Sequence, residues 1–229
     1  METVTQLDRG AARHGGPGTE REMIDLADPQ SIDYLTGVYV EPFERLFALC
    51  LRTDGSHVFF LNKLFSVPET PIEKVWFTDT DDSIGMLAQR IQAGEPLGID
   101  KEWPARFLLP LMERLPGTPC QLASDCVDSV RARKDAAEQE LMRMNSRLND
   151  EAMTRAAAYI REGMTEAQVA DFLLAQYKEL GCQDVSFPPI VSFGANAADP
   201  TTCRTVPSCG RATALCWISA AKRMGTAQI

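Results

Sequence analysis

The chain has 229 residues, of which 45% are hydrophobic and 24% charged, enough for one large soluble domain or two small ones. Its net charge of −9 disfavours nucleic acid and anionic membranes as partners, because no basic cluster is present to bind phosphates. No stretch approaches the roughly 20 apolar residues of a membrane span, and the polar N-terminus lacks the apolar core of a signal peptide. We therefore expect a cytoplasmic protein.

The seven cysteines, an odd number at irregular spacing, do not form a disulfide framework. We expect free thiols in a reducing compartment. A cysteine-dependent hydrolase is disfavoured, because no histidine follows His57 to act as its base. Four cysteines lie in or beside apolar segments and are predicted to pack as small hydrophobic side chains: Cys50, Cys120, Cys126 and Cys182.

The first part of the chain predicts an α/β layer, with strands alternating with helices. Residues 1–21 are rich in glycine and are expected to form a flexible lead. A short helix, capped by Asp28 or Ser31, is expected to end at Gly37. We predict strands over 46–52, 57–62, 75–78 and 97–100, a hairpin turn over 53–56, and helices over 82–93 and 104–114. No phosphate loop, dinucleotide fingerprint, nucleophile elbow or paired-histidine motif is present.

Two helices are predicted in the next part. The first is expected to run from Val130 to about Arg161. The second starts at a capping box formed by Thr165 and Gln168 and ends at Gly181. Its apolar stripe comprises Val169, Phe172, Leu173 and Tyr177.

Several motifs then occur in a specific order. Asp33-Tyr-Leu-Thr-Gly37 precedes the α/β part, and Val130-Arg-Ala-Arg-Lys-Asp-Ala-Ala-Glu-Gln-Glu-Leu141 stands where that part ends. Gly163-Met-Thr-Glu-Ala-Gln-Val-Ala170 lies between the helices, and Phe187-Pro-Pro-Ile-Val-Ser-Phe-Gly-Ala-Asn-Ala-Ala-Asp-Pro200 follows. From Asp28 to Pro200 the chain resembles the metallopeptidases of the creatinase, prolidase and Xaa-Pro aminopeptidase family.

The resemblance implies a fold and an activity. Residues 22–129 would form a creatinase-like N-terminal domain, with a mixed sheet and flanking helices. Residues 130–200 would form the first part of an α+β pita-bread catalytic domain, in which Ser192, Asn196 and Asp199 would line a substrate pocket. Family members hydrolyse peptides next to proline with two divalent metal ions, manganese, zinc or cobalt, bridged by a water. The resemblance also implies dimer contacts made by the N-terminal domain.

The resemblance ends at Pro200, before the segments that carry the family's catalytic residues. The family's metal ligands are two aspartates, a histidine and two glutamates downstream of Pro200, and a substrate-binding histidine follows the Asp-Pro pair. Here Thr201-Thr202 follows, and no ligand motif appears. We therefore expect no catalytic residue and no metal ligand in this chain. The whole relatives would act on proline-containing peptides.

Residues 201–229 have no helical or alternating period, and Cys203, Cys209 and Cys216 match no zinc-ligand spacing. Two alternatives stand: a divergent C-terminus, or translation in a shifted frame. Reading the last base of each codon with the first two of the next turns Cys216-Trp217 into leucine and Trp217-Ile218 into aspartate. The same shift turns Met224-Gly225 into glycine and permits His-His after Pro200. The shifted frame therefore resembles the family's first metal-aspartate motif.

Two functions follow. The chain is predicted to be an inactive fragment of a proline-directed metallopeptidase; the alternative is a non-enzymatic interaction module built on the N-terminal domain. In a fragment, we expect the apolar stripes of both predicted helices after Val130 to be exposed, and limited proteolysis to leave a core ending near Arg131. Residues 23–27 are too short for the helix and strand that usually precede Asp28 in the family, so we also expect a missing edge element.

Overall fold

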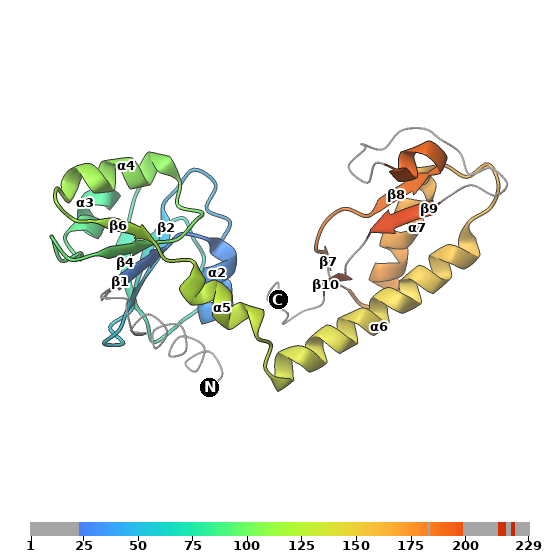
Figure 1. Ribbon diagram of the computed structural model, residues 1–229, viewed down its shortest axis with the longest axis horizontal. Coiled ribbons are helices and arrows are strands. Elements are labelled where there is room, and N and C mark those ends of the chain that lie inside the picture. The colour runs from blue at the N-terminus through green and yellow to red at the C-terminus, as the bar shows by residue number, and fades with distance from the viewer. Residues whose placement is uncertain (1–22, 183, 199–214, 219–220, 223–229) are drawn as a thin grey trace. The chain divides into compact units, whose positions relative to one another are not determined.

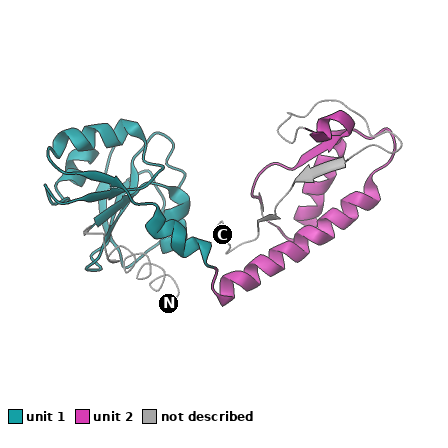
Figure 2. Cartoon of the chain, viewed as in Figure 1, with its two compact units in different colours: residues 1–133 teal, residues 134–229 magenta. Residues whose placement is uncertain are grey.

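The computed structural model describes residues 23–182, 184–198, 215–218 and 221–222, with backbone alone for residue 184 and the last two ranges (Figure 1). The predicted lead over 1–21 lies outside these residues. The chain forms two compact units, residues 1–133 and 134–229 (Figure 2). None of the described helices combines the length and apolar character needed to cross a membrane.

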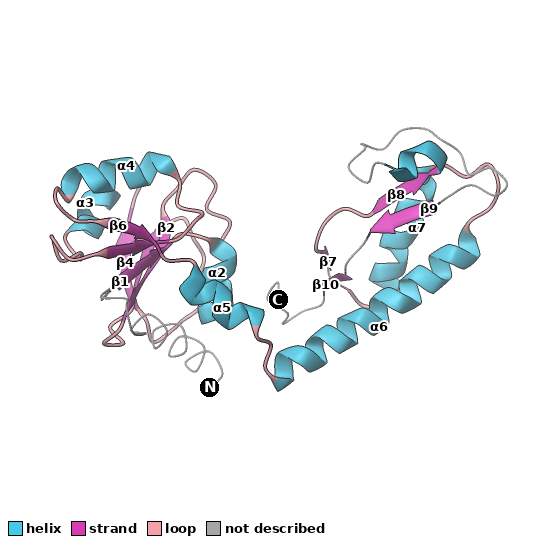
Figure 3. Ribbon diagram, in the orientation of Figure 1, coloured by secondary structure: helices cyan, strands magenta, loops and turns pink. Residues whose placement is uncertain are grey.

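Unit 1 is built on a mixed six-stranded sheet with helices on both faces (Figure 3), which confirms the predicted fold class. The strand order is β4-β3-β2-β1-β5-β6. The β1–β2 and β2–β3 pairs are antiparallel, whereas β3–β4, β1–β5 and β5–β6 are parallel. The strands are β1 (Met23–Leu26), β2 (Phe47–Arg52), β3 (Val58–Asn62), β4 (Glu73–Phe77), β5 (Leu97–Ile99) and β6 (Cys120–Leu122). The helices are α2 (Pro29–Thr36), α3 (Ser83–Ala88), α4 (Ala105–Arg114) and α5 (Asp125–Ala132).

Alternate residues of the strands enter two separate cores, one on each face of the sheet. Ile24 and Leu26 of β1 pack in the core that includes residues of α2 and α5. Met23, the residue before Ile24 in β1, packs in the other core, which includes residues of α3 and α4. Because both faces are covered, β2 and β3 read as continuous apolar runs, which is why the sequence predicts them well.

The expected loss of the strand before Asp28 is wrong, whereas a helix preceding that strand would lie outside the described residues. Residues 23–26 form β1, and this strand pairs with β2 on one side and β5 on the other. It is therefore an interior strand, and its four residues are all buried. The sequence analysis also missed β6, a three-residue edge strand whose length is too short to show a period.

Asp28 is the cap of α2, since its carboxylate accepts hydrogen bonds from the amides of Gln30 and Ser31. Gly37 ends that helix with a left-handed φ of 71°, as predicted. From α5, the Arg131 guanidinium lies 3.9 Å from the Asp28 carboxylate. The arginine of the Val130–Leu141 motif therefore joins α5 to the start of α2.

Two predicted helices have the wrong length. The helix expected over 82–93 ends at Ala88, where turns replace it. The helix expected from Val130 to Arg161 is two helices, α5 and α6 (Ala136–Tyr159). A capping box starts the second: the Asp135 carboxylate accepts from the Glu138 amide at 3.0 Å, and the Glu138 carboxylate accepts from the Asp135 amide at 2.8 Å. The Asp-x-x-Glu signature was legible in the sequence but was overlooked.

Unit 2 packs two helices with short strands. Besides α6 it contains α7 (Glu166–Glu179), β7 (Asp184–Val185), β8 (Ile190–Phe193), a 3-10 helix η1 (Gly194–Ala198), β9 (Leu215–Ile218) and β10 (Ala221–Lys222). Strand β8 pairs with β9, and β7 pairs with β10, both antiparallel. The sequence analysis predicted neither β9 nor β10.

The apolar stripe of α7 is covered, so the expected exposure is wrong. Leu173 and Tyr177 pack with Ala152 and Ala156 of α6, and the ring of Phe172 stacks on Tyr159 with centroids 3.8 Å apart. The remaining stripe residue, Val169, packs with Val191 and Phe193 of β8. Both helices of unit 2 therefore have partners for their apolar faces.

Candidate functional site

The corner between β8 and η1 is organised by one buried carboxylate. Glu166 is 2% exposed, and its Oε1 accepts hydrogen bonds from the Phe193 amide at 2.8 Å and from the Asn196 side-chain amide at 3.0 Å. We call Glu166, Phe193 and Asn196 the Glu166 corner. It fixes the end of β8 and the first turn of η1 to the start of α7.

Local sequence explains each part of this corner. The Thr165 hydroxyl accepts from the Gln168 amide, and the Gln168 side chain accepts from the Thr165 amide, so the predicted capping box is formed. Glu166 then occupies the first residue of α7, where the helix dipole favours a negative charge. Gly194 has a left-handed φ of 57°, which lets the chain turn from β8 into η1.

The structure places the predicted pocket residues Ser192 and Asn196 in different contacts. Asn196 is bound by Glu166, and Ser192 is buried in β8, whose backbone pairs at this residue with Cys216 of β9. Because neighbouring strand residues alternate, Ser192 faces away from the side on which Val191 and Phe193 pack. Asp199 lies outside the described residues.

Sequence reasoning missed Glu166. The sequence analysis includes the motif Gly163–Ala170 but assigns no role to its glutamate. A charged residue directly after a capping threonine was the available signal. Its partners lie 27 and 30 residues away, however, and local patterns do not show contacts at that distance.

The described residues offer no metal centre and no activated nucleophile. Among them, no group of three or more histidine, cysteine, aspartate or glutamate side chains could hold a metal ion. Cys50 and Cys120 are free cysteines, and burial raises the pKa of both thiols. Thiols held in their protonated form are poor nucleophiles. The Nδ1 of His57 accepts a hydrogen bond from the Arg52 amide at 3.2 Å, which is a structural role.

Comparison with known families identifies both units. A model of creatinase/prolidase N-terminal domains matches residues 22–133, and a model of metallopeptidase family M24 matches residues 140–215. The chain belongs to the creatinase/prolidase group of M24 metallopeptidases. Its Glu166 corner lies within the M24 match.

An uncharacterized peptidase of Staphylococcus aureus is 27% identical over 186 residues, which cover 76% of this chain and 50% of the relative. The M24 chain described here therefore spans about half the length of the curated relatives it matches.

Solved structures share its fold. A prolidase from Thermococcus sibiricus matches 98% of this chain and 63% of its own with a TM-score of 0.86 at 24% identity. Dipeptidase PepE from Mycobacterium ulcerans matches 97% of this chain and 61% of its own, also with a TM-score of 0.86 at 24% identity.

Replacing Glu166 should destabilise unit 2 of this M24 chain. The Glu166→Ala change leaves the buried Phe193 amide and the Asn196 side chain without their acceptor, which we expect to cost about 2–4 kcal/mol of unfolding free energy. Urea unfolding of the purified chain measures the loss, and amide exchange at Phe193 should accelerate with it.

The matched control is Asp171→Ala on the same helix, because Asp171 is exposed. We expect that change to alter the unfolding free energy by less than about 0.5 kcal/mol. Equal effects of the two substitutions would show that Glu166 does not hold the corner.

Proposed function

We propose that this chain is part of a proline-directed metallopeptidase and does not hydrolyse peptides by itself. One observation carries the proposal. The sequence has two histidines, His14 and His57, and both precede residues 140–215 that match the M24 model. The resemblance implies a histidine among the metal ligands, and this chain has none in its peptidase part.

The residues present do not fit a two-metal centre. A catalytic metal site needs several carboxylate or imidazole ligands converging on one point. In the parts of the chain that the structure describes, no such group exists. We therefore derive no hydrolytic step for this chain, and we assign the two divalent ions only to full-length members.

The substrate class rests on the relatives. Solved neighbours include an Xaa-Pro dipeptidase from Bacillus anthracis, with a TM-score of 0.75 at 17% identity. We propose proline-containing peptides as substrates of the whole enzyme, with Ser192, Asn196 and Asp199 as a remnant of its pocket. In that pocket the Glu166 corner would fix the Asn196 amide. A cytoplasmic location stays a prediction from the sequence.

We also propose that residues 201–229 are translated in a shifted reading frame. In support, β9 contains Cys216, Trp217 and Ile218, whose shifted reading gives leucine and aspartate. This strand pairs with β8, so the shifted reading would put an aspartate on the strand next to the one that contains Ser192. The coding DNA tests the idea: the shifted frame should continue beyond this point with histidine and glutamate motifs. A stop codon soon after codon 229 in that frame would end the proposal and favour a divergent C-terminus.

A second candidate is an interaction module built on unit 1. The observation that favours it is the six-stranded sheet with a core on each face, which has the features of an independently folding domain. A homodimer through this unit is the form that the resemblance implies.

Peptidase assays separate the two candidates from a working enzyme. We expect the purified chain, supplied in turn with manganese, zinc and cobalt salts, to release no proline from alanyl-proline above the rate without protein. The physical reason is that the described part of the chain offers no group of carboxylate and imidazole ligands to bind a metal and activate water.

A full-length family member assayed in parallel is the control for substrate and metal quality. Metal-dependent turnover by this chain would overturn the proposal. Light scattering on the same sample then distinguishes an inactive peptidase fragment from an interaction module. A defined dimer without activity favours the interaction module.

A further inference from the structure

Unit 1 has a concentration of unsatisfied polar atoms at one end of β1 and β2. Buried side-chain atoms without a hydrogen-bond partner in the described parts of the chain are Asp25 Oδ1, Asp25 Oδ2, Arg52 Nε, Thr70 Oγ1 and Asn145 Oδ1. Three of these five atoms belong to Asp25 and Arg52. Such atoms are uncommon in folded proteins because leaving them unpaired is costly, so two residues together call for an explanation.

Asp25 and Arg52 lie on the same face of the sheet. In the antiparallel β1–β2 pair, Asp25 is opposite Cys50, and Met23 is opposite Arg52. Arg52 is therefore the diagonal neighbour of Asp25, a separation that a long side chain can bridge. The carboxyl of Asp25 is 0% exposed, so water does not solvate it.

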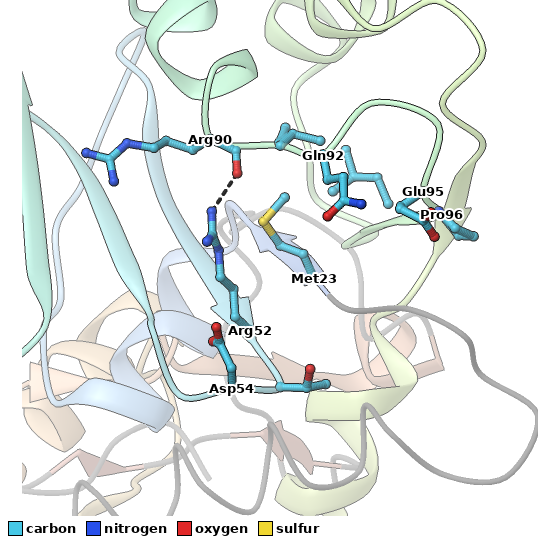
Figure 4. Close-up of a pocket in the computed structure, with 10 residues that line it drawn as sticks. Met23, Arg52, Asp54, Arg90, Gln92, Glu95 and Pro96 are labelled. Carbon is cyan, nitrogen blue, oxygen red and sulfur yellow. Dashed lines mark hydrogen bonds between the residues drawn. The ribbon is translucent and has the colours of Figure 1, made fainter.

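The Arg52 guanidinium makes no hydrogen bond with this carboxyl, and it binds a backbone carbonyl instead. Its Nη2 donates to the backbone carbonyl of Arg90 at 2.5 Å, as the dashed line in Figure 4 shows. Arg52 also lines a cavity of about 300 Å³, together with Met23, Leu97 and the connection between α3 and β5. The side chain therefore has room to move and an unused buried donor.

The surroundings of Asp25 raise the pKa of its carboxyl and so favour the neutral form at acid pH. Burial raises the pKa of Asp25 to about 7; the Cys50 thiol and the Arg52 guanidinium lower it, and the Asp100 carboxyl raises it further. A thiol is only a weak donor, so Cys50 does not satisfy the carboxyl. Two other groups face this end of the sheet. The Cys120 thiol is kept protonated by burial, and the Trp103 indole donates to the backbone carbonyl of Asp25 rather than to its side chain.

We propose that Asp25 and Arg52 form a proton-controlled switch in the N-terminal domain. With Asp25 neutral, Arg52 holds the Arg90 carbonyl. When Asp25 loses its proton, the Arg52 side chain turns inward to pair with the carboxylate and releases that carbonyl.

The balance of interactions gives the direction. An ionised carboxylate buried without a partner is far more costly than a neutral one, whereas Arg52 gives up only one hydrogen bond to an uncharged acceptor. The inward arrangement therefore wins once Asp25 is charged. Its consequence is local: the connection between α3 and β5 loses its tether to the end of β2 as the pH rises through neutrality.

A double-mutant cycle at two pH values tests the switch in the full chain. The variants are Asp25→Asn, which imitates the neutral acid, Arg52→Met, which keeps the aliphatic stem, and the double variant. The coupling is the factor by which the unfolding equilibrium constant of the double variant departs from the product of the two single effects. We expect no coupling, a factor of about 1, at about pH 5.5, and a factor of roughly 10 at about pH 8.5. Urea unfolding followed by tryptophan fluorescence provides the constants.

The sign of the pH effect is fixed by the raised pKa. The stability contributed by the neutral carboxyl is fully present below its unfolded value of 3.8 and is lost as the pH rises through about 7. Stability of the unsubstituted chain should therefore fall over that interval, and Asp25→Asn should remove that part of the fall. The matched control is Asp54, an exposed aspartate that lines the same cavity; hydrogen bonds from Ser56 lower its pKa. Its cycle with Arg52, made with Asp54→Asn, should show the same coupling at both pH values.

Equal coupling of Asp25 and Arg52 at both pH values would overturn the proposal. If a variant fails to fold, NMR of the unsubstituted chain decides the question. The carboxyl carbon of Asp25 and the Nε of Arg52 should then titrate with one shared midpoint near 7. A midpoint for Asp25 in the ordinary aspartate range, or an Arg52 Nε signal that does not follow it, would equally refute the switch.

Discussion

The fold of unit 1 depends on burying β1 on both faces. This strand joins the antiparallel side of the sheet, through β2, to the parallel side, through β5. It also supplies residues to both cores, so the two helical layers share it. A charged residue in such a strand cannot reach water, and that constraint is what gives Asp25 its unusual position. Burial raises the pKa of Asp25 to about 7, so the neutral form of the carboxyl predominates below that pH.

Unit 2 also contains a buried carboxylate, Glu166, but this one has hydrogen-bond donors. Glu166 has hydrogen-bond donors from the Phe193 amide and the Asn196 side chain, and it lies at a helix start that favours negative charge. Its ionised form is therefore satisfied, whereas Asp25 has no comparable donors among the described residues. Glu166 fixes the beginning of the peptidase fold. Among the described residues, no group of three or more histidine, cysteine, aspartate or glutamate side chains could hold a metal ion.

Local patterns predicted the elements that carry a strong local signal. The apolar runs of β2 and β3, the cap at Asp28 and the box at Thr165 and Gln168 are of this kind. The sequence analysis did not predict β1 and β6, which are too short to show a period, although it did predict the equally short β5. It also could not predict the Glu166 corner, because the partners are far apart along the chain. The break before Asp135 is different, since its capping signature was present and was given too little weight.

We propose that this chain has the scaffold of an M24 peptidase but not its catalytic metal centre. Elemental analysis of the purified native chain, after incubation with manganese, zinc or cobalt and removal of excess salt, tests it most directly. We predict metal far below one ion per chain for each element, because the described residues contain no cluster of ligands to retain it. Two tightly held ions per chain, lost on unfolding, would contradict it.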